Sequence, residues 1–241
     1  MNSILAAEML EIYDDNDVSD KVIKNKYKLT YFNIKGLAET TRLIFAIAGE
    51  EYEDFRYELE VINMAKYEFK KDQFDNDKEC GKLKLSLNKL PFLTINDKVL
   101  CQSKAIERYL AREFNLMGIS NIESAMIDSL CECIRDFKDA YQIVRKAENK
   151  EEAMNHWFTE SLKEKMEMFE NLLGNNTGFS VGNQLSLSDI IIYSFIKEFF
   201  DDKLSALSAC ANCPKVNSIL NNVSNNDNLK KWLDNRPITV F

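Results

Sequence analysis

The sequence predicts two domains, an α/β domain followed by an all-helical domain. Three observations predict this division. Residues 27–48 have the pattern of a short strand, a turn and a helix. Further strand patterns recur up to Leu100. Beyond Asn121 the apolar residues repeat at helical spacing. Residues 118–121 are therefore the expected linker.

The first strand pattern covers Tyr27–Phe32, which alternates and is rich in aromatic and β-branched residues. Gly36 breaks this pattern, and apolar residues then recur at helical spacing up to Ala48. Tyr31 lies at the carboxyl end of the strand, where α/β folds place ligand chemistry. This stretch is therefore the first place to look for a functional site.

The remainder of the first domain continues with strands and one clear helix. Residues 52–57 alternate as a second strand, whereas the charged residues 59–87 are expected to form helix and loop as an insertion. Two strands joined by a tight hairpin follow Pro91, and residues 104–114 form a helix for which Ser103 is the expected N-cap. This order predicts a thioredoxin-like domain over residues 27–114.

The second domain, residues 121–241, is predicted to be entirely helical. Two long helices are expected over 123–145 and 151–173, with a loop at 174–182. Ser186 and Asp189 form a capping-box pattern before an apolar helix over 190–200, and Leu185 and Ile190 suit a hydrophobic staple. Two shorter helices should follow, one opened by Pro214. Residues 1–26 are expected to be a partly disordered extension.

Composition excludes several classes of function. The 241 residues carry a formal net charge of −8, which argues against nucleic acid or an anionic membrane as the main partner. No apolar run approaches the roughly 20 residues of a membrane span. The single histidine, His156, excludes a multi-histidine metal site. Six cysteines without a recognisable secretory signal predict a reduced, cytoplasmic protein.

The cysteines are tested as rival functional groups. Cys210 and Cys213 have the spacing of a redox motif. In thioredoxin-like redox proteins, however, that pair lies at the start of the first helix, a place that here holds residues 31–34. Cys131 and Cys133 would point to different sides of a helix. Both pairs are therefore expected to be structural.

The stretch Lys28-Leu29-Thr30-Tyr31-Phe32-Asn33, with Gly36, Ala38-Glu39 and Arg42 after it, resembles the opening of sigma-class cytosolic glutathione transferases. That class includes the haematopoietic-type prostaglandin D synthases. Residues 232–237 also match the sigma-class ending. The resemblance implies a homodimer that uses glutathione as co-substrate and needs no metal. It implies conjugation of glutathione to small hydrophobic electrophiles in detoxification, or isomerisation through a transient glutathione adduct.

The chemistry of that family requires a glutathione thiolate. A free thiol titrates near about 8.5, so it is mostly protonated at neutral pH. A buried hydrogen-bond donor aimed at the sulfur lowers this pKa, and a tyrosine phenol donates while remaining protonated itself. The resemblance assigns this role to Tyr31. The alternative is a tyrosine packed at a strand end as part of the core.

The resemblance also implies how glutathione is held. Leu90 would offer its backbone edge before a cis Pro91, and the pair Gln102-Ser103 would meet the γ-glutamyl carboxylate at a helix N-terminus. Either Lys66 or Lys82 would meet the glycyl carboxylate. The carboxylate of Asp136 would come from the second subunit.

The electrophile pocket is expected to be apolar, with walls from both domains: Phe32, Ile34, Leu37, Tyr141 and Phe241. Two departures from the family weaken the expected activity, because Leu37 replaces a supporting arginine and Ile62 replaces a tryptophan. Arg135 interrupts the cluster that binds a divalent ion in some prostaglandin D synthases. The alternatives are a non-enzymatic binding or structural module, a prostaglandin-synthase-type isomerase and a cysteine-dependent reductase.

Overall fold

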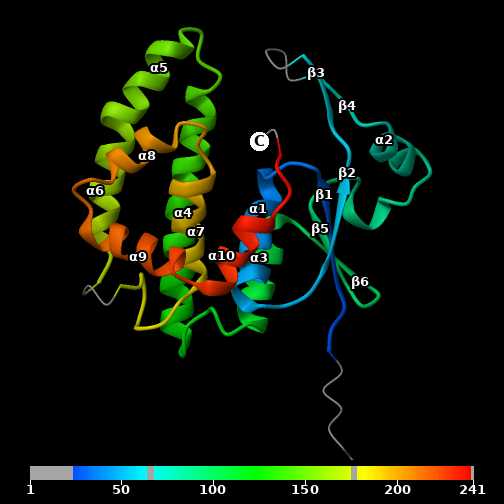
Figure 1. Cartoon of the computed structure of the whole chain (residues 1–241), viewed down its shortest axis with the longest axis horizontal. Coiled ribbons are helices and arrows are strands. Elements are labelled where there is room, and N and C mark those ends of the chain that lie inside the picture. Colours follow the sequence, from blue (N-terminus) through cyan, green and yellow to red (C-terminus); the bar gives the residue numbers. More distant parts are fainter. Residues whose placement is uncertain (1–23, 64–67, 175–177, 240–241) are drawn as a thin grey trace, which may run out of the picture.

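The computed structural model describes residues 24–63, 68–174 and 178–239. It contains an α/β domain beside a domain of helices (Figure 1). The expected opening is confirmed, with β1 (Tyr27–Phe32), a 3₁₀ turn (Gly36–Ala38), α1 (Glu39–Ala48) and β2 (Glu53–Tyr57). Gly49 adopts a φ of 66° and ends α1 in the left-handed conformation that glycine favours. The predicted fold class, a thioredoxin-like domain followed by an all-helical domain, is confirmed.

A four-stranded sheet forms the centre of the first domain, in the order β2-β1-β5-β6. The strands β5 (Phe92–Ile95) and β6 (Lys98–Cys101) form the expected hairpin, and β1 pairs parallel with β2 and antiparallel with β5. Figure 1 shows α1 and α3 (Ser103–Glu113) on the side of the sheet nearer the helical domain and α2 (Asp72–Glu79) on the other side. The carboxyl end of β1 therefore lies beside the second domain.

The charged stretch 59–87 differs from its prediction as helix and loop. It contains the antiparallel strands β3 (Glu60–Asn63) and β4 (Glu68–Lys70) before α2 and a 3₁₀ turn (Lys84–Ser86). The strands are short and their side chains are half-buried or exposed. These two strands form through backbone pairing and have no buried apolar face. The pattern of apolar and polar residues therefore could not predict them.

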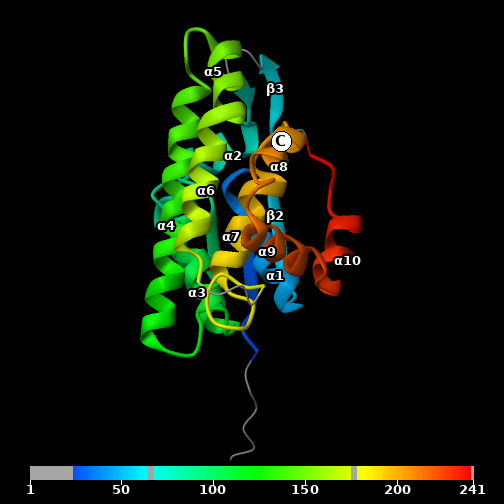
Figure 2. The same cartoon turned by 90° about the vertical axis from the view of Figure 1, so that its left-hand side faces the viewer.

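Helices make up the second domain (Figures 1 and 2). The helix α4 (Asn121–Val144) is followed by α5 (Lys150–His156), which continues through a π-helical turn (Trp157–Ser161) into α6 (Leu162–Leu172). The helix α7 (Leu187–Tyr193) likewise continues into a π-helical turn (Ser194–Glu198). Three described helices follow where two were expected: α8 (Lys203–Ala209), α9 (Pro214–Ser224) and α10 (Asp227–Asn235). Pro214 opens α9 as predicted.

The capping box at the start of α7 is confirmed. Asp189 accepts hydrogen bonds from the backbone of Ser186 at 2.8 Å and of Ser180 at 2.7 Å. Every residue of α7 is buried, so this helix forms the core of the second domain. In the described part of the chain, no helix is long and apolar enough to cross a membrane.

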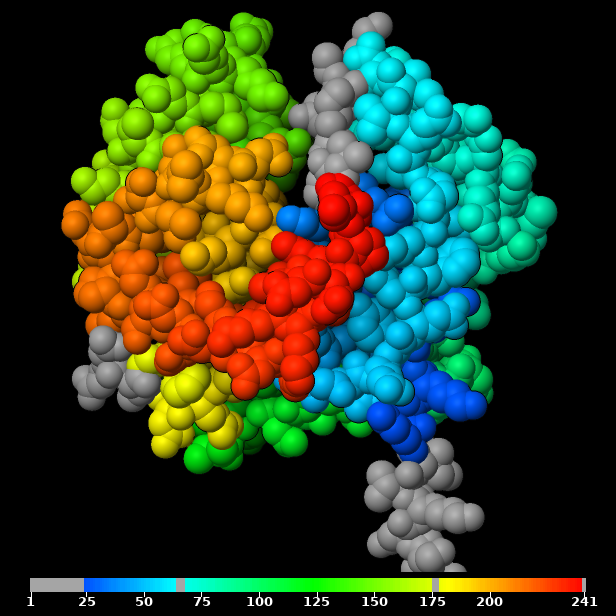
Figure 3. All heavy atoms as spheres, in the orientation of Figure 1, coloured from blue at the N-terminus to red at the C-terminus, as the bar shows by residue number. Residues whose placement is uncertain are grey.

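The C-terminal segment crosses the junction between the domains, shown in red in Figure 3. Arg236, just after α10, lies 2.6 Å from Glu39 of α1 and 2.9 Å from Glu198 of the helical domain. Thr40 and Ser194 also share a hydrogen bond of 3.1 Å across the same junction. Polar contacts as well as core packing therefore hold the two domains together.

Candidate functional site

Tyr31 is buried at the carboxyl end of β1, with 7% of its surface exposed. The backbone N–H of Leu37 donates a hydrogen bond of 3.1 Å to the Tyr31 hydroxyl oxygen. Because that oxygen acts as the acceptor, its own proton remains available to a ligand. Burial raises the pKa of Tyr31, so the phenol stays protonated at neutral pH.

Gly36 permits this arrangement. Its φ is +43°, and a Cβ placed there would lie 2.6 Å from the Tyr31 hydroxyl oxygen. Such a contact is far closer than van der Waals packing allows. The turn between β1 and α1 therefore needs glycine both for its backbone angle and for the position of Tyr31.

Arg42 is the cation near Tyr31. It is fully buried, donates to the carbonyl of Ile34 at 2.7 Å and pairs with Asp54 at 3.1 Å. Its guanidinium carbon lies 5.9 Å from the centre of the Tyr31 ring. The positive charge of Arg42 opposes the rise in the Tyr31 pKa that burial causes. Lys35, by contrast, pairs with Glu198 at 3.0 Å.

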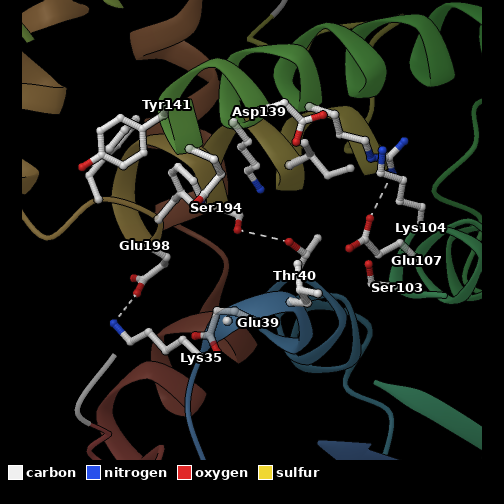
Figure 4. A pocket seen from close by; sticks show the side chains of 18 of the residues that line it. Lys35, Glu39, Thr40, Ser103, Lys104, Glu107, Asp139, Tyr141, Ser194 and Glu198 are labelled. Atoms are coloured by element: carbon white, nitrogen blue, oxygen red, sulfur yellow. Dashed lines mark hydrogen bonds and ion pairs between the residues drawn. The ribbon is translucent and has the colours of Figure 1, made fainter. Parts of the chain in front are cut away.

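A cavity of about 680 Å³ lies between the domains beside Tyr31. Its walls come from the loop after β1, the start of α3, the carboxyl half of α4 and residues 191–203 (Figure 4). Both polar and aromatic side chains line it. Its lining includes Tyr31, Leu37, Thr40, Ser103, Glu107, Lys138, Tyr141, Ser194, Phe199, Phe200 and Thr239.

Of the residues expected to hold glutathione through the backbone or a helix N-terminus, Ser103 lines the cavity, whereas Leu90, Pro91 and Gln102 are not among the described residues that line it. The Leu90–Pro91 bond is cis, as the resemblance implied, and leads directly into β5. Ser103 lines the cavity as the first residue of α3, whereas Gln102 occupies the N-cap position with a φ of 72°. The expectation that Ser103 is the N-cap is therefore wrong by one residue. The side chain of Ser103 nevertheless stays at the helix N-terminus, where an anion is favoured.

Leu37 and Tyr141 line the cavity, but other predicted residues lie elsewhere. Phe32 packs against Tyr57 and Phe74 on the opposite face of the sheet, because neighbouring residues of a strand point to opposite faces. Ile34 packs against the main core. Lys82 pairs with Asp77 at 2.6 Å, and Asp136 is exposed on α4. Lys66 and Phe241 lie outside the described residues.

Several charged residues of the cavity were not predicted. Glu107 of α3 and Arg135 of α4 are both buried and pair at 3.1 Å. Lys138 follows Phe137 on α4, and Glu107 follows the buried Ile106 on α3. The sequence signal that could have indicated these residues is a charged residue next to the apolar stripe of a helix. This signal is weak, because most such charged residues are solvated.

The rival groups have structural surroundings. Burial raises the pKa of Cys210 to about 12 and that of Cys213 to about 11, so both thiols are poor nucleophiles. At the position of the possible divalent-ion cluster, the carboxylate of Glu132 contacts two arginines, Arg108 and Arg135. Among the residues that the structure describes, no group of three acidic, cysteine or histidine residues could hold a metal ion.

Comparison with known families agrees with this geometry. The model of the glutathione S-transferase N-terminal domain matches residues 27–112, and that of the glutathione S-transferase C-terminal domain matches residues 135–236. The chain belongs to the glutathione S-transferase family. Each of the two family models matches one of the two domains that border the cavity.

Individual relatives support the same assignment. The probable glutathione S-transferase 6 of Caenorhabditis elegans is 32% identical over 226 residues, which cover 89% of this chain and 98% of the relative. The hematopoietic prostaglandin D synthase of Gallus gallus is 35% identical over 164 residues, covering 68% and 74% of the two chains. The crystal structure of monomeric Na-GST-3, a glutathione S-transferase of Necator americanus, superimposes with a TM-score of 0.69 at 29% identity, covering 90% and 100%.

Proposed function

We propose that this chain is a sigma-type, cytoplasmic glutathione transferase that uses Tyr31 to activate the glutathione thiolate for attack on small hydrophobic electrophiles. The hydrogen bond from Leu37 to the Tyr31 oxygen carries this proposal. That bond fixes the ring and leaves the phenolic proton free to donate to sulfur. The raised pKa of Tyr31 keeps that proton in place, and the inter-domain cavity offers space for an electrophile.

The reaction needs little more than a stabilised thiolate. The thiol proton passes to solvent as glutathione binds, and the sulfur lone pair then attacks the electrophilic carbon. With 1-chloro-2,4-dinitrobenzene a carbon–sulfur bond forms and chloride leaves with the bonding pair. Throughout, the Tyr31 phenol donates to the sulfur and is neither consumed nor ionised.

In this proposal, glutathione binding uses the residues that the family resemblance assigns. The backbone of Leu90, next to Pro91, would pair with the cysteinyl unit. Ser103 and the N-terminus of α3 would hold the γ-glutamyl carboxylate, beside Gln102. Lys66 or Lys82 would meet the glycyl carboxylate. Detoxification is the role that such chemistry serves.

Thiolate absorbance tests the proposed function. We expect glutathione bound to the wild type to titrate well below the about 8.5 of a free thiol. In Tyr31→Phe the hydrogen bond to the charged sulfur is lost, so the pKa of the bound thiol should rise and kcat should fall by about 10 to 100-fold. Tyr27→Phe removes a phenol from the same strand, outside the cavity lining, and should change neither. Glutathione binding with an unshifted thiol pKa in the wild type would exclude the role of Tyr31.

We also propose that the protein is a homodimer, in which Asp136 of one subunit reaches the glutathione amino group of the other. Asp136 is exposed on α4, and Ile122 and Met126 of the same helix are exposed apolar residues suited to an interface. Sedimentation equilibrium should report a dimer, and Asp136→Asn should raise the KM for glutathione. A monomer with an unchanged KM in Asp136→Asn would contradict this assignment.

Isomerisation through a glutathione adduct is the second candidate, since a relative is named a prostaglandin D synthase. It uses the same thiolate but regenerates glutathione. Product analysis separates the two reactions, because conjugation consumes one glutathione per turnover and isomerisation consumes none. Failure to bind glutathione at all would instead favour a non-enzymatic binding or structural module.

A further inference from the structure

The helix α4 presents a lysine to the cavity. Lys138 is half-buried and lines the same cavity as Tyr31. Its ammonium nitrogen lies 5.3 Å from the centre of the Phe199 ring, another lining residue. A lysine held against an aromatic wall keeps its charge near the cavity instead of extending it into bulk solvent.

Ion pairing distinguishes Lys138 from other cations of the cavity. Lys35 and Lys203 lie 3.0 and 3.9 Å from Glu198, and Lys104 lies 3.8 Å from Glu132. Among the described residues, no ion pair involves Lys138. The negative charge that acts most strongly on it is that of Glu107, whose carboxylate pairs with Arg135 at 3.1 Å. Lys138 therefore shares the field of Glu107 with Arg135, which also contacts Glu132.

The electrostatics of Lys138 agree with this imbalance. Burial lowers the pKa of Lys138, and Arg135 and Lys104 act in the same direction. The negative charge of Glu107 opposes the shift but does not cancel it. An anion placed beside the ammonium would offset the cost of burying its charge.

We propose that Lys138 binds a carboxylate of the electrophile, so that this enzyme selects apolar electrophiles that carry their own carboxylate. The inference rests on the proposed function, because it assigns the second substrate of the same cavity. Leu37, Tyr141 and Phe200 would contact the apolar body of the substrate, and the volume of about 680 Å³ suits a molecule of drug size. The reactive carbon would face Tyr31 on the first domain while the carboxylate meets Lys138 on the second.

Ethacrynate and its methyl ester provide the test, because both carry the same reactive enone and only the acid is charged. The thiolate sulfur adds to the terminal alkene carbon, the alkene π pair moves to the carbonyl as an enolate, and the α carbon takes a proton from solvent. No group leaves. The ratio of kcat/KM for the acid to that for the ester therefore reports recognition of the carboxylate rather than reactivity.

We expect this acid-to-ester ratio to fall about tenfold in Lys138→Met, the loss typical of one charge-assisted hydrogen bond. Lys138→Arg keeps the charge and should retain most of the preference. Lys203→Met removes a cation that lines the same cavity and already has a carboxylate partner, so the ratio should stay near the wild-type value. An unchanged ratio in Lys138→Met, or an equal fall in Lys203→Met, would overturn the inference.

A binding measurement separates this inference from the proposed function. Saturated ethacrynate cannot react, so calorimetry with this acid and its methyl ester reports binding alone. The wild type should bind the acid more tightly than the ester, and Lys138→Met should lose that preference. If the wild type conjugates none of the electrophiles, including 1-chloro-2,4-dinitrobenzene, the proposed function fails. The calorimetric preference then still decides whether Lys138 holds a carboxylate.

Discussion

Tyr31 combines two hydrogen-bonding roles in one hydroxyl group. Its oxygen accepts from the Leu37 N–H, and its proton can be given to a ligand. The acceptor bond orients the ring before any ligand arrives, so the ligand does not bear the entropic cost of ordering it. This preorganisation depends on the turn that carries Gly36 and Leu37.

Replacing Gly36 by alanine tests that dependence. The new Cβ would lie 2.6 Å from the Tyr31 oxygen in a backbone conformation with positive φ, so either the turn or the ring must move. We expect Gly36→Ala to lower kcat by about 10 to 100-fold through misplacement of the donor, and to raise the pKa of bound glutathione. Steady-state kinetics and thiolate absorbance measure both effects.

Gly174→Ala is the matched control, because a Cβ at Gly174 would meet nothing within 4 Å. Its kinetics should equal those of the wild type. Normal kinetics in Gly36→Ala would show that the position of Tyr31 does not depend on the turn.

Some residues of the site could be predicted from the sequence and others could not. Tyr31 and Ser103 stand next to recognisable strand and helix boundaries, and the structure brings both to one cavity. Lys138 and Glu107 lie inside helices, where a charge beside an apolar stripe resembles any solvated residue. Their relation arises only from the packing of α3 against α4, which no local pattern encodes.

Among the elements, α7 depends most on its first turn. Asp189 is fully buried and accepts three hydrogen bonds, from Ser180 and from the backbone and hydroxyl of Ser186. The helix it caps is buried along its whole length. The stability of the second domain therefore depends on one carboxylate that does no chemistry.

Asp189→Ala should lower the free energy of unfolding by about 3 kcal/mol, because it leaves buried donors without acceptors. Urea denaturation followed by circular dichroism measures this loss. Asn226→Ala removes the side-chain cap of α10, which accepts from Leu229 at 2.9 Å, and should cost only about 1 kcal/mol. Equal losses of stability in the two variants would mean that the burial of Asp189 does not increase the contribution of its hydrogen bonds.

Elements with a strong local sequence signal could be predicted, whereas elements that depend on backbone pairing between short segments could not. The strand β1 and the start of α7 carry strong local signals, namely alternation and a capping box, and both were predicted. The β3–β4 hairpin depends on pairing between two short, partly exposed segments, and it was missed. Strand alternation would also have separated Phe32 from Tyr31, because adjacent residues of β1 point to opposite faces.

For the whole molecule, a charged cluster at the domain junction joins the C-terminal segment to both domains. Arg236 contacts both Glu39 and Glu198, and Lys35 also pairs with Glu198. Glu39 and Glu198 are almost fully buried as side chains. These positions lie far apart in the sequence, so composition and spacing could not predict the cluster.

Arg236→Met should destabilise the protein by about 2 to 4 kcal/mol, because it leaves buried carboxylates with fewer partners. The Lys28–Glu53 pair lies on the exposed surface, and Lys28→Met should change stability by at most about 0.5 kcal/mol. Urea denaturation of both variants measures the difference. A loss of stability in Arg236→Met no larger than that in Lys28→Met would show that the domain junction does not depend on the ion pairs of Arg236.

The same variant should respond to pH in a defined direction. Burial raises the pKa of Glu39 in the folded protein, and the charge of Arg236 opposes this rise. Without Arg236 the folded state holds the Glu39 proton more strongly than the unfolded state does, so its stability increases as pH falls. The deficit of Arg236→Met should therefore be smaller at about pH 5 than at about pH 8. A deficit that grows on acidification would contradict this account.

The bond between Arg236 and Glu39 spans 197 residues, which has a consequence for how the protein is made. A ribosome that adds about 5 to 20 residues per second needs roughly 10 to 40 seconds to travel from one partner to the other. During that interval the nascent first domain has α1, in which Arg42 pairs with Glu39, but it lacks both Arg236 and Thr239, which lines part of the cavity. The newborn chain therefore cannot complete the cavity beside Tyr31 until Thr239 has been synthesised.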